Sequence, residues 1–136
     1  MTAAEYVHEI SLLLDRGYPA DCVTHACRIA ELLHAEGRAP WIGRVRHVTN
    51  EGEHVMHWPL APVRFAGRAP LVWNTHYVAA AGREVYDPLI GQPIDVDAYV
   101  LEAFGKQLAV ETFLDAEATA RLLRDGSLKS AFRVRV

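Results

Sequence analysis

A cysteine at a predicted helix start is the first residue of this sequence that could do chemistry. Cys22 follows Asp21 directly and falls in the opening turn of the predicted helix. Unpaired backbone N–H groups and the helix dipole favour a thiolate at such a position. With a histidine nearby, a cysteine pKa can fall from about 8.5 to between about 3.5 and 7.5. The alternative is a small buried apolar residue, which is how most free cysteines behave.

His76 and Asp87 could complete a catalytic group with this cysteine. They lie in NTHYVAAAGREVYDP, residues 74–88, where a Gly-Arg turn predicts a hairpin that brings both near the same level of the ladder. A nucleophilic cysteine needs a base within hydrogen-bond reach, and that base needs a third group to orient it. A core histidine and a turn aspartate would fit the same pattern.

Trp73 and Asn74 are candidate substrate-binding residues because they lie three and two residues before His76. In a regular strand Asn74 shares the face of His76 and Trp73 points the other way, although Trp73 could still shield the site. His25 is a rival partner for Cys22. A shared helix, however, sets the directions of these two side chains and supplies no orienting carboxylate, so His76 is favoured.

Two groups of residues could suggest a metal site: Cys22, His25 and Cys27, and His47, His54 and His57. Neither group has the spacing of a closed zinc site, and His54 and His57 would face opposite sides of a strand. Cys27 lies mid-helix and is interpreted as a core residue. We therefore expect neither a metal ion nor a cofactor.

Composition narrows the classes of function. The chain has 136 residues, 51% hydrophobic and 23% charged, which indicates a single globular domain over residues 1–136. The net charge of -3 is small, and the charges are spread along the chain without a basic stripe. No nucleic-acid partner is therefore expected. Apolar runs are far shorter than a membrane span, and the N-terminus lacks signal-peptide features. These observations predict a cytoplasmic protein with reduced thiols and no membrane partner, with delivery as a secreted effector left open.

Apolar spacing and turn residues predict the elements that must position these side chains. Helices are predicted over residues 3–16, 22–37, 94–105 and 114–126, and strands over 40–48, 53–60, 69–81, 84–88 and 130–136. Asp21 and Asp115 are expected to cap helices, and Gly37 is expected to end one. Helices come first, and mostly antiparallel strands with later helices follow, so the predicted fold class is α+β.

The stretch DCVTHACRIAELLHAEGRAPWIGRV resembles the cysteine helix of transglutaminase-like proteins in the papain-like cysteine hydrolase superfamily. The family pattern has alanine four positions after the cysteine, two leucines at ten and eleven, and glycine at fifteen. The matching residues are Cys22, Ala26, Leu32, Leu33 and Gly37. The family continues with a strand bearing histidine and a hairpin to a strand that ends in Asp-Pro, which THYVAAAGREVYDP matches. The resemblance covers about residues 18–100.

This resemblance implies a papain-like or transglutaminase-like core, in which the nucleophile helix packs on an antiparallel sheet. It implies Cys22 as nucleophile, His76 as general base and acid, and Asp87 as the residue that orients the imidazole. The backbone N–H of Cys22 could serve as one oxyanion donor. Arg16 stands where papain-like enzymes commonly have a glutamine, so the second donor stays open.

The histidine motif also departs from the family, because Tyr77 and Val78 follow His76 where the usual sequence is His-Ala-Trp. The substrate class therefore stays open as well. A Cys-His-Asp group performs acyl transfer at an amide. Water as acceptor gives a peptidase or a glutamine deamidase, and an amine gives a transglutaminase. We predict a cysteine-dependent hydrolase or acyltransferase acting on a protein or peptide. The alternative is an inactive member that binds a peptide by strand addition, for example at residues 130–136.

Overall fold

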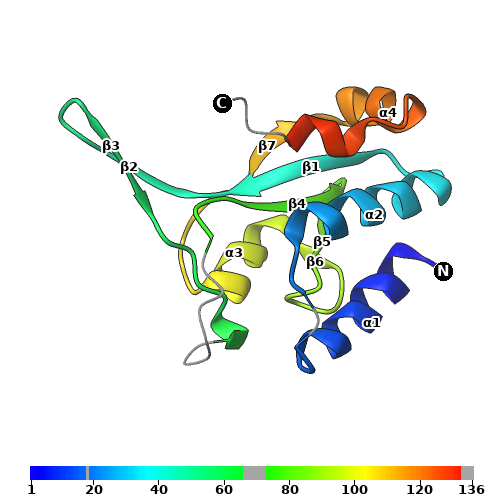
Figure 1. The fold of residues 1–136 in the computed structure, drawn as a ribbon, viewed down its shortest axis with the longest axis horizontal. Coiled ribbons are helices and arrows are strands. Elements are labelled where there is room, and N and C mark those ends of the chain that lie inside the picture. The colour runs from blue at the N-terminus through cyan, green and yellow to red at the C-terminus, as the bar shows by residue number, and fades with distance from the viewer. Residues whose placement is uncertain (18, 66–72, 133–136) are drawn as a thin grey trace.

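The computed structural model of the protein describes residues 1–17, 19–65 and 73–132. Within them, four α-helices and a five-stranded antiparallel sheet form an α+β fold, as the sequence predicts (Figure 1). The elements in chain order, with η for a 3-10 helix, are α1 (Ala3–Leu14), α2 (Cys22–Ala35), β1 (Pro40–Val45), β2 (His47–Glu51), β3 (His54–Trp58), η1 (Val63–Phe65), β4 (His76–Ala81), β5 (Glu84–Tyr86), β6 (Ile94–Asp95), α3 (Val96–Phe104), β7 (Glu111–Leu114), α4 (Ala116–Arg124) and η2 (Leu128–Phe132).

Strand β4 lies in the middle of the sheet, whose strand order is β6-β5-β4-β1-β7. Its alternate residues enter two separate core clusters, with Val78 and Ala80 in one and Ala79 and Ala81 in the other. A strand that is covered on both faces needs apolar residues at successive positions, which explains the unbroken run VAAA. The turn at Gly82 then joins β4 to β5, as predicted, with a positive φ of 57° that glycine adopts readily.

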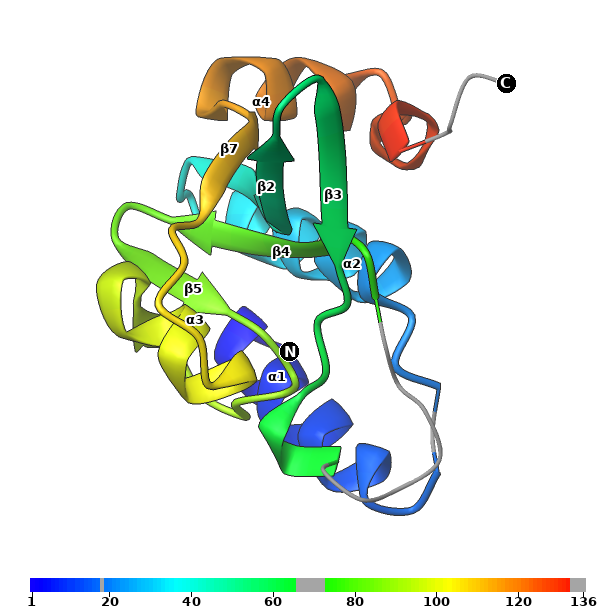
Figure 2. The ribbon, with the colours of Figure 1, turned by 90° about the vertical axis from the view of Figure 1, so that its left-hand side faces the viewer.

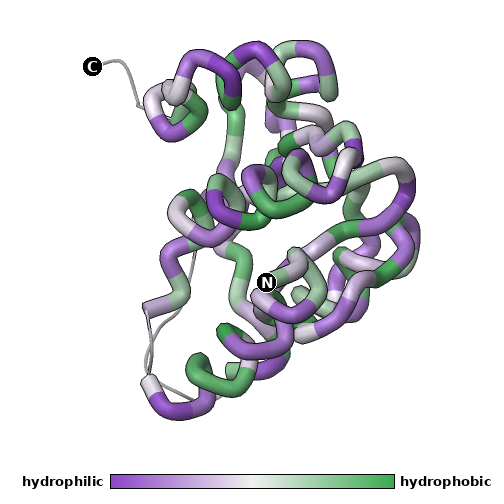
Figure 3. Tube along the Cα trace, turned by 90° about the vertical axis from the view of Figure 1, so that its right-hand side faces the viewer, coloured by the Kyte–Doolittle hydropathy of each residue, from purple (hydrophilic) through white to green (hydrophobic). Residues whose placement is uncertain are grey.

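Helix α2 packs against β4 and β1, and α1 packs against α2. The Asp21 side chain accepts a hydrogen bond from the backbone N–H of Thr24 and caps the start of α2, as predicted. Gly37, with a φ of 78°, follows its last turn. Hydrophobic and hydrophilic segments alternate along the helices (Figure 3), as expected for helices with one face on a core.

The strand predicted over residues 40–48 divides into two strands that belong to different sheets. β1 stays in the five-stranded sheet, while β2 pairs with β3 in a separate hairpin. The turn that joins β2 to β3 lies at residues 52–53, at the end of the gap between the strands predicted over 40–48 and 53–60. The hairpin projects past the end of β1 in Figure 1 and comes toward the viewer in Figure 2. We call residues 47–58 the β2–β3 arm.

The prediction of a strand over residues 130–136 is wrong for residues 130–132, the part that the structure describes. Leu128–Phe132 form the 3-10 helix η2, and residues 133–136 lie outside the described residues. Leu128 is buried in the core, and the ring of Phe132 packs against those of Tyr77 and Phe113. Leu128 and Phe132 thus face the body at a helical spacing, and this packing outweighs the local alternation of SAFRVRV. The sequence pattern does not predict the short strands β6 and β7.

Of the strand predicted over residues 69–81, only His76–Ala81 is a strand, and residues 69–72 lie outside the described part. The helices predicted over 94–105 and 114–126 are confirmed with shorter bounds, and Asp115 caps α4. None of the helices within the described residues has the length and apolar character that a membrane crossing requires.

Replacing Gly91 by alanine should destabilise the fold more than the same change at Gly17. Both have positive φ, 87° and 85°, so both lose about 1–2 kcal/mol through backbone strain. A Cβ at Gly91 would also lie 2.8 Å from Ser11 Oγ, whereas none would be near Gly17. Urea denaturation should show a further loss of roughly 1–3 kcal/mol for Gly91→Ala. Equal losses would show that Ser11 moves aside freely.

Candidate active site

Cys22 is the first residue of α2, where the helix leaves backbone N–H groups without intrahelical partners. The Asp21 carboxylate accepts from the Thr24 hydroxyl and backbone N–H, which fixes the helix start. The N–H of Cys22 donates to no other described group. The side chain is partly exposed and is a free thiol. Both the thiol and a backbone donor are therefore placed at a helix N-terminus, as predicted.

His76 begins β4, and Asp87 directly follows the last residue of β5. His76 Nε2 lies 2.8 Å from Asp87 Oδ2, and each residue is only 3% exposed. The hairpin predicted from the Gly-Arg turn therefore brings the two residues together, with Ala79 opposite Tyr86 just before Asp87. The structure bears out the pairing itself.

The pKa values of this pair favour a charged imidazolium beside a carboxylate. Burial alone lowers the pKa of His76. The charge of Asp87, the hydrogen bond to it and the interaction with Cys22 outweigh that effect and raise the pKa to about 9. Burial raises the pKa of Asp87, but the charge and hydrogen bond of His76 lower it by more, so the net direction is down. At neutral pH the ion pair is the stable form.

The thiol of Cys22 lies close enough to His76 to help raise the pKa of the imidazole. Because Nε2 is engaged by Asp87, the nitrogen left for Cys22 is Nδ1. Nδ1 is buried and has no hydrogen-bond partner among the described residues. The arrangement leaves one imidazole nitrogen held by the carboxylate and the other free to exchange a proton.

Tyr99 is a site residue that the sequence analysis missed. Its side chain is fully buried on α3, and its hydroxyl donates a hydrogen bond to Asp87 Oδ2. The Leu89 backbone N–H donates to the other oxygen, Oδ1, at 2.9 Å. Burial and the nearby Asp87 charge raise the pKa of Tyr99 well above 10, so it remains a neutral donor. A tyrosine on the apolar face of a predicted helix was the available signal, because a buried hydroxyl requires a partner.

Aromatic rings enclose the imidazole of His76. The Trp73 ring centroid lies 4.7 Å from that of His76, and Phe104 on α3 lies edge-on at 5.4 Å. The expectation that Trp73 points away is wrong, because the chain bends at residues 74–75 and the regular strand begins only at His76. Trp73 nevertheless packs against the imidazole of His76, which agrees with the prediction that it shields the site. Asn74 is exposed on the bend, and no described contact ties it to His76.

Both ring nitrogens of His25 lie within hydrogen-bond distance of other groups, which disfavours His25 as a rival base for Cys22. Its Nδ1 lies 2.8 Å from the Tyr6 hydroxyl, and its Nε2 lies 3.0 Å from the Pro19 carbonyl oxygen. The residue is 6% exposed and connects α1 and the loop before α2 to the helix body. His25 therefore positions the segment that leads to Cys22.

Arg64 connects the turn after Asp87 to helix α1. Its guanidinium donates to the Ser11 backbone and hydroxyl oxygens, and to the Pro88 carbonyl oxygen at 3.1 Å. It also pairs with Asp15. These bonds hold the residues after Asp87 from outside the hairpin, and their long sequence separation hid them from the sequence analysis.

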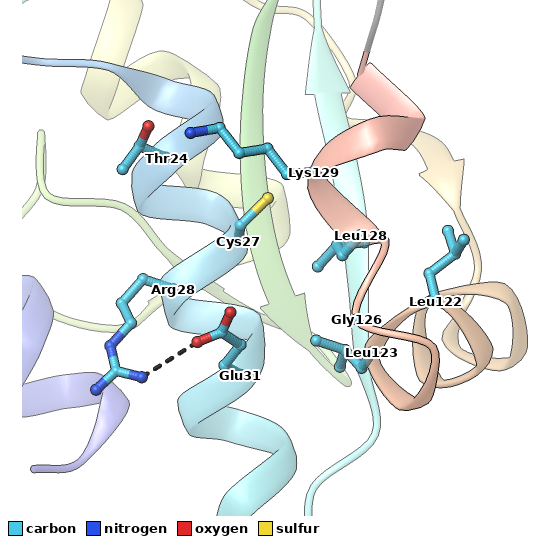
Figure 4. A pocket seen from close by; sticks show the side chains of 9 residues that line it. All are labelled: Thr24, Cys27, Arg28, Glu31, Leu122, Leu123, Gly126, Leu128 and Lys129. Atoms are coloured by element: carbon cyan, nitrogen blue, oxygen red, sulfur yellow. Dashed lines mark hydrogen bonds and ion pairs between the residues drawn. The ribbon is translucent and has the colours of Figure 1, made fainter.

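Cys27 belongs to a different surface from the site. Its thiol is buried, and burial together with the Glu31 charge raises its pKa to about 11. Figure 4 shows its sulfur beside Leu128 and Lys129, in a cavity of about 390 Å³ between α2 and the chain around η2. An exposed Arg28–Glu31 ion pair lies at one side. This placement agrees with the prediction that Cys27 is a core residue.

The histidines His47, His54 and His57 lie on the β2–β3 arm, and His54 and His57 occupy opposite faces of it. Across the described part of the chain, no three histidine, cysteine or acidic residues are placed to hold one metal ion. No family model matches this sequence, and no curated protein or solved structure matches it either.

The raised pKa of His76 predicts how stability depends on pH. Since the folded value of about 9 exceeds the ordinary 6.5, this contribution is complete below pH 6.5 and is lost as pH rises through 9. The free energy of unfolding should fall by on the order of 1–3 kcal/mol over that range. Asp87→Asn should flatten the profile and lower the titration midpoint of His76 in NMR.

Asp95→Asn is the matched control, because Asp95 is an exposed aspartate at the start of α3. The control should keep the pH dependence of the wild type. A His76 midpoint near 6.5 in the wild-type protein would contradict the buried ion pair.

Proposed function

We propose that this protein is a cysteine-dependent amide hydrolase or acyltransferase that acts on a protein or peptide, with a papain-like or transglutaminase-like core. The supporting observation is the buried His76–Asp87 ion pair beside a partly exposed thiol at a helix N-terminus. The resemblance of residues 18–100 to the transglutaminase-like pattern agrees with it. The roles are nucleophile for Cys22, general base and acid for His76, and orienting carboxylate for Asp87.

Each proposed role has a physical basis. In this ion pair the proton already lies on the imidazole of His76, which Asp87 stabilises in its charged form, so Cys22 reacts as the thiolate beside the imidazolium. The thiolate attacks the amide carbon, and the developing oxyanion receives the N–H of Cys22. The imidazolium then protonates the leaving amine and the acyl group stays on sulfur. Water completes hydrolysis after losing a proton to His76, and a primary amine completes transamidation in the same way.

A non-catalytic binding module on the same fold is the second candidate. The space beside His76 favours it, because the cavity lined there by Trp73, His25 and Asp87 holds about 10 Å³. That is room for about one water molecule. A substrate amide must therefore reach the imidazole from the Cys22 side or displace Trp73. Strand addition at residues 130–132 does not support this candidate, because Leu128–Phe132 are helical.

Thiol labelling distinguishes the two candidates. Iodoacetamide at pH 6 should modify Cys22 at least tenfold faster than Cys27, because Cys27 is buried with a pKa of about 11. His76→Ala should slow the labelling of Cys22 at pH 6 by tenfold or more. Mapping the modified cysteine by mass spectrometry provides the measurement, and Cys27 serves as an internal reference.

His57→Ala is a suitable control for the histidine change, because His57 is exposed on the β2–β3 arm. It should leave the labelling rate unchanged. Slow labelling of Cys22 with the pH dependence of an ordinary thiol, insensitive to His76→Ala, would refute the catalytic candidate and favour the binding module.

Amide turnover tests the reaction class directly. We expect wild-type protein to release ammonia from casein glutamines, to cleave the chain, or to incorporate dansylcadaverine, and these products separate the three chemistries. Cys22→Ala should abolish the product. Asp87→Asn should reduce the rate by roughly 10²–10⁴-fold, since the imidazole loses its orienting partner. Activity retained in Cys22→Ala would rule out a cysteine nucleophile.

A further inference from the structure

The β2–β3 arm exposes apolar side chains on both of its faces. Val55, Met56 and Trp58 are 57%, 40% and 41% exposed, and every residue of β3 is exposed. The register places Val55 on one face, opposite Asn50, and Met56 on the other, opposite Thr49. Large apolar side chains at successive positions on a projecting strand indicate a surface that another molecule covers.

Both ends of the arm lie at the candidate active site. Val45 pairs with His76 across β1 and β4, and the arm begins two residues later. At the other end, Leu60 exchanges two backbone hydrogen bonds with Trp73, whose ring packs on His76. Figure 1 shows the arm projecting from the end of the sheet where β1 stops and β4 starts. A polypeptide held along the arm would thus be led to the site.

The backbone of the arm is also open to a further strand. β2 and β3 pair only with each other in the described part of the chain, so each keeps an outer edge with unpaired N–H and C=O groups. Neither strand contains proline or lysine, the residues that commonly protect edges. A two-stranded hairpin alone is marginally stable in water, and a third strand would stabilise it.

The charges of the arm indicate what this strand carries. Glu51 and Glu53 lie at the tip, both are exposed, and neither forms an ion pair with a described residue. Glu51 shares the face of Thr49 and Met56, whereas Val48 and Val55 share the other face. An added strand would match the arm with basic or hydroxyl side chains on the first face and apolar ones on the second.

We propose that the β2–β3 arm docks an extended, basic and apolar segment of the polypeptide substrate by strand addition and leads it to Cys22. This proposal rests on the proposed function for the identity of that polypeptide as substrate. It adds the docking surface and the chemistry of the segment, which the triad alone does not specify.

The test measures binding in a Cys22→Ala background, so that it requires no catalysis. The probe is acetyl-Lys-Val-Thr-Val-Lys-Val-Thr-Val-Lys-amide, which alternates apolar with basic or hydroxyl residues. We expect saturable binding by calorimetry and amide-exchange protection within residues 47–58. Val55→Lys and Met56→Lys should each weaken binding at least fivefold. Leu101→Lys is the matched control, because Leu101 is a 49% exposed leucine on α3, and it should change nothing.

Two further peptides test the mode of binding. Proline at two of the valine positions removes backbone donors and should abolish binding. Glutamate in place of lysine should weaken it tenfold or more, and Glu53→Gln should reduce its dependence on salt. The proposal is overturned if the probe does not bind, if protection falls outside the arm, or if the proline peptide binds equally well. Self-association that Val55→Lys removes would also overturn it, in favour of a second copy as occupant.

Binding and catalysis fail separately in this design. Loss of docking with amide turnover intact would refute the arm proposal alone. Docking in a chain whose Cys22 shows ordinary thiol reactivity would refute the proposed catalysis, and the docked peptide would then be a ligand instead of a substrate.

Discussion

The buried ion pair between His76 and Asp87 is the interaction on which the architecture around the site depends. Removing a carboxylate and an imidazolium from water costs several kcal/mol per ion, and their attraction offsets this only with good geometry and further hydrogen bonds. Tyr99 and the Leu89 N–H supply those bonds to both carboxylate oxygens. The turn after β5 and helix α3 therefore stabilise the buried charge of Asp87 in addition to closing the core.

The remaining elements hold the partners of this pair in place. The β4–β5 hairpin sets the spacing between His76 and Asp87, and Arg64 fastens the following turn to α1. The Asp21 cap and the bonds of His25 fix where α2 begins, and hence where Cys22 lies. Segments that are far apart in the chain thus meet at one end of the sheet. Such a rigid surround is what a site needs when a proton must move between positioned groups.

The β2–β3 arm contrasts with this buried centre. It extends from the same end of the sheet, with exposed apolar side chains and unpaired edges where the site has packed aromatic rings. The cavity beside His76 is small, at about 10 Å³. The two proposals together assign recognition to the arm and chemistry to its base.

Local sequence determined much of this protein: the α+β class, the capped helix that starts at Cys22, the hairpin that joins His76 to Asp87, and the projecting turn between β2 and β3. These features depend on spacing, capping and turn residues within short segments. Tertiary structure alone decided that Tyr99 bonds Asp87, that Trp73 packs on His76, and that His25 is engaged by Tyr6 and Pro19. It also decided that Leu128–Phe132 form a helix. These outcomes depend on burial and contacts between distant segments, which no local pattern encodes.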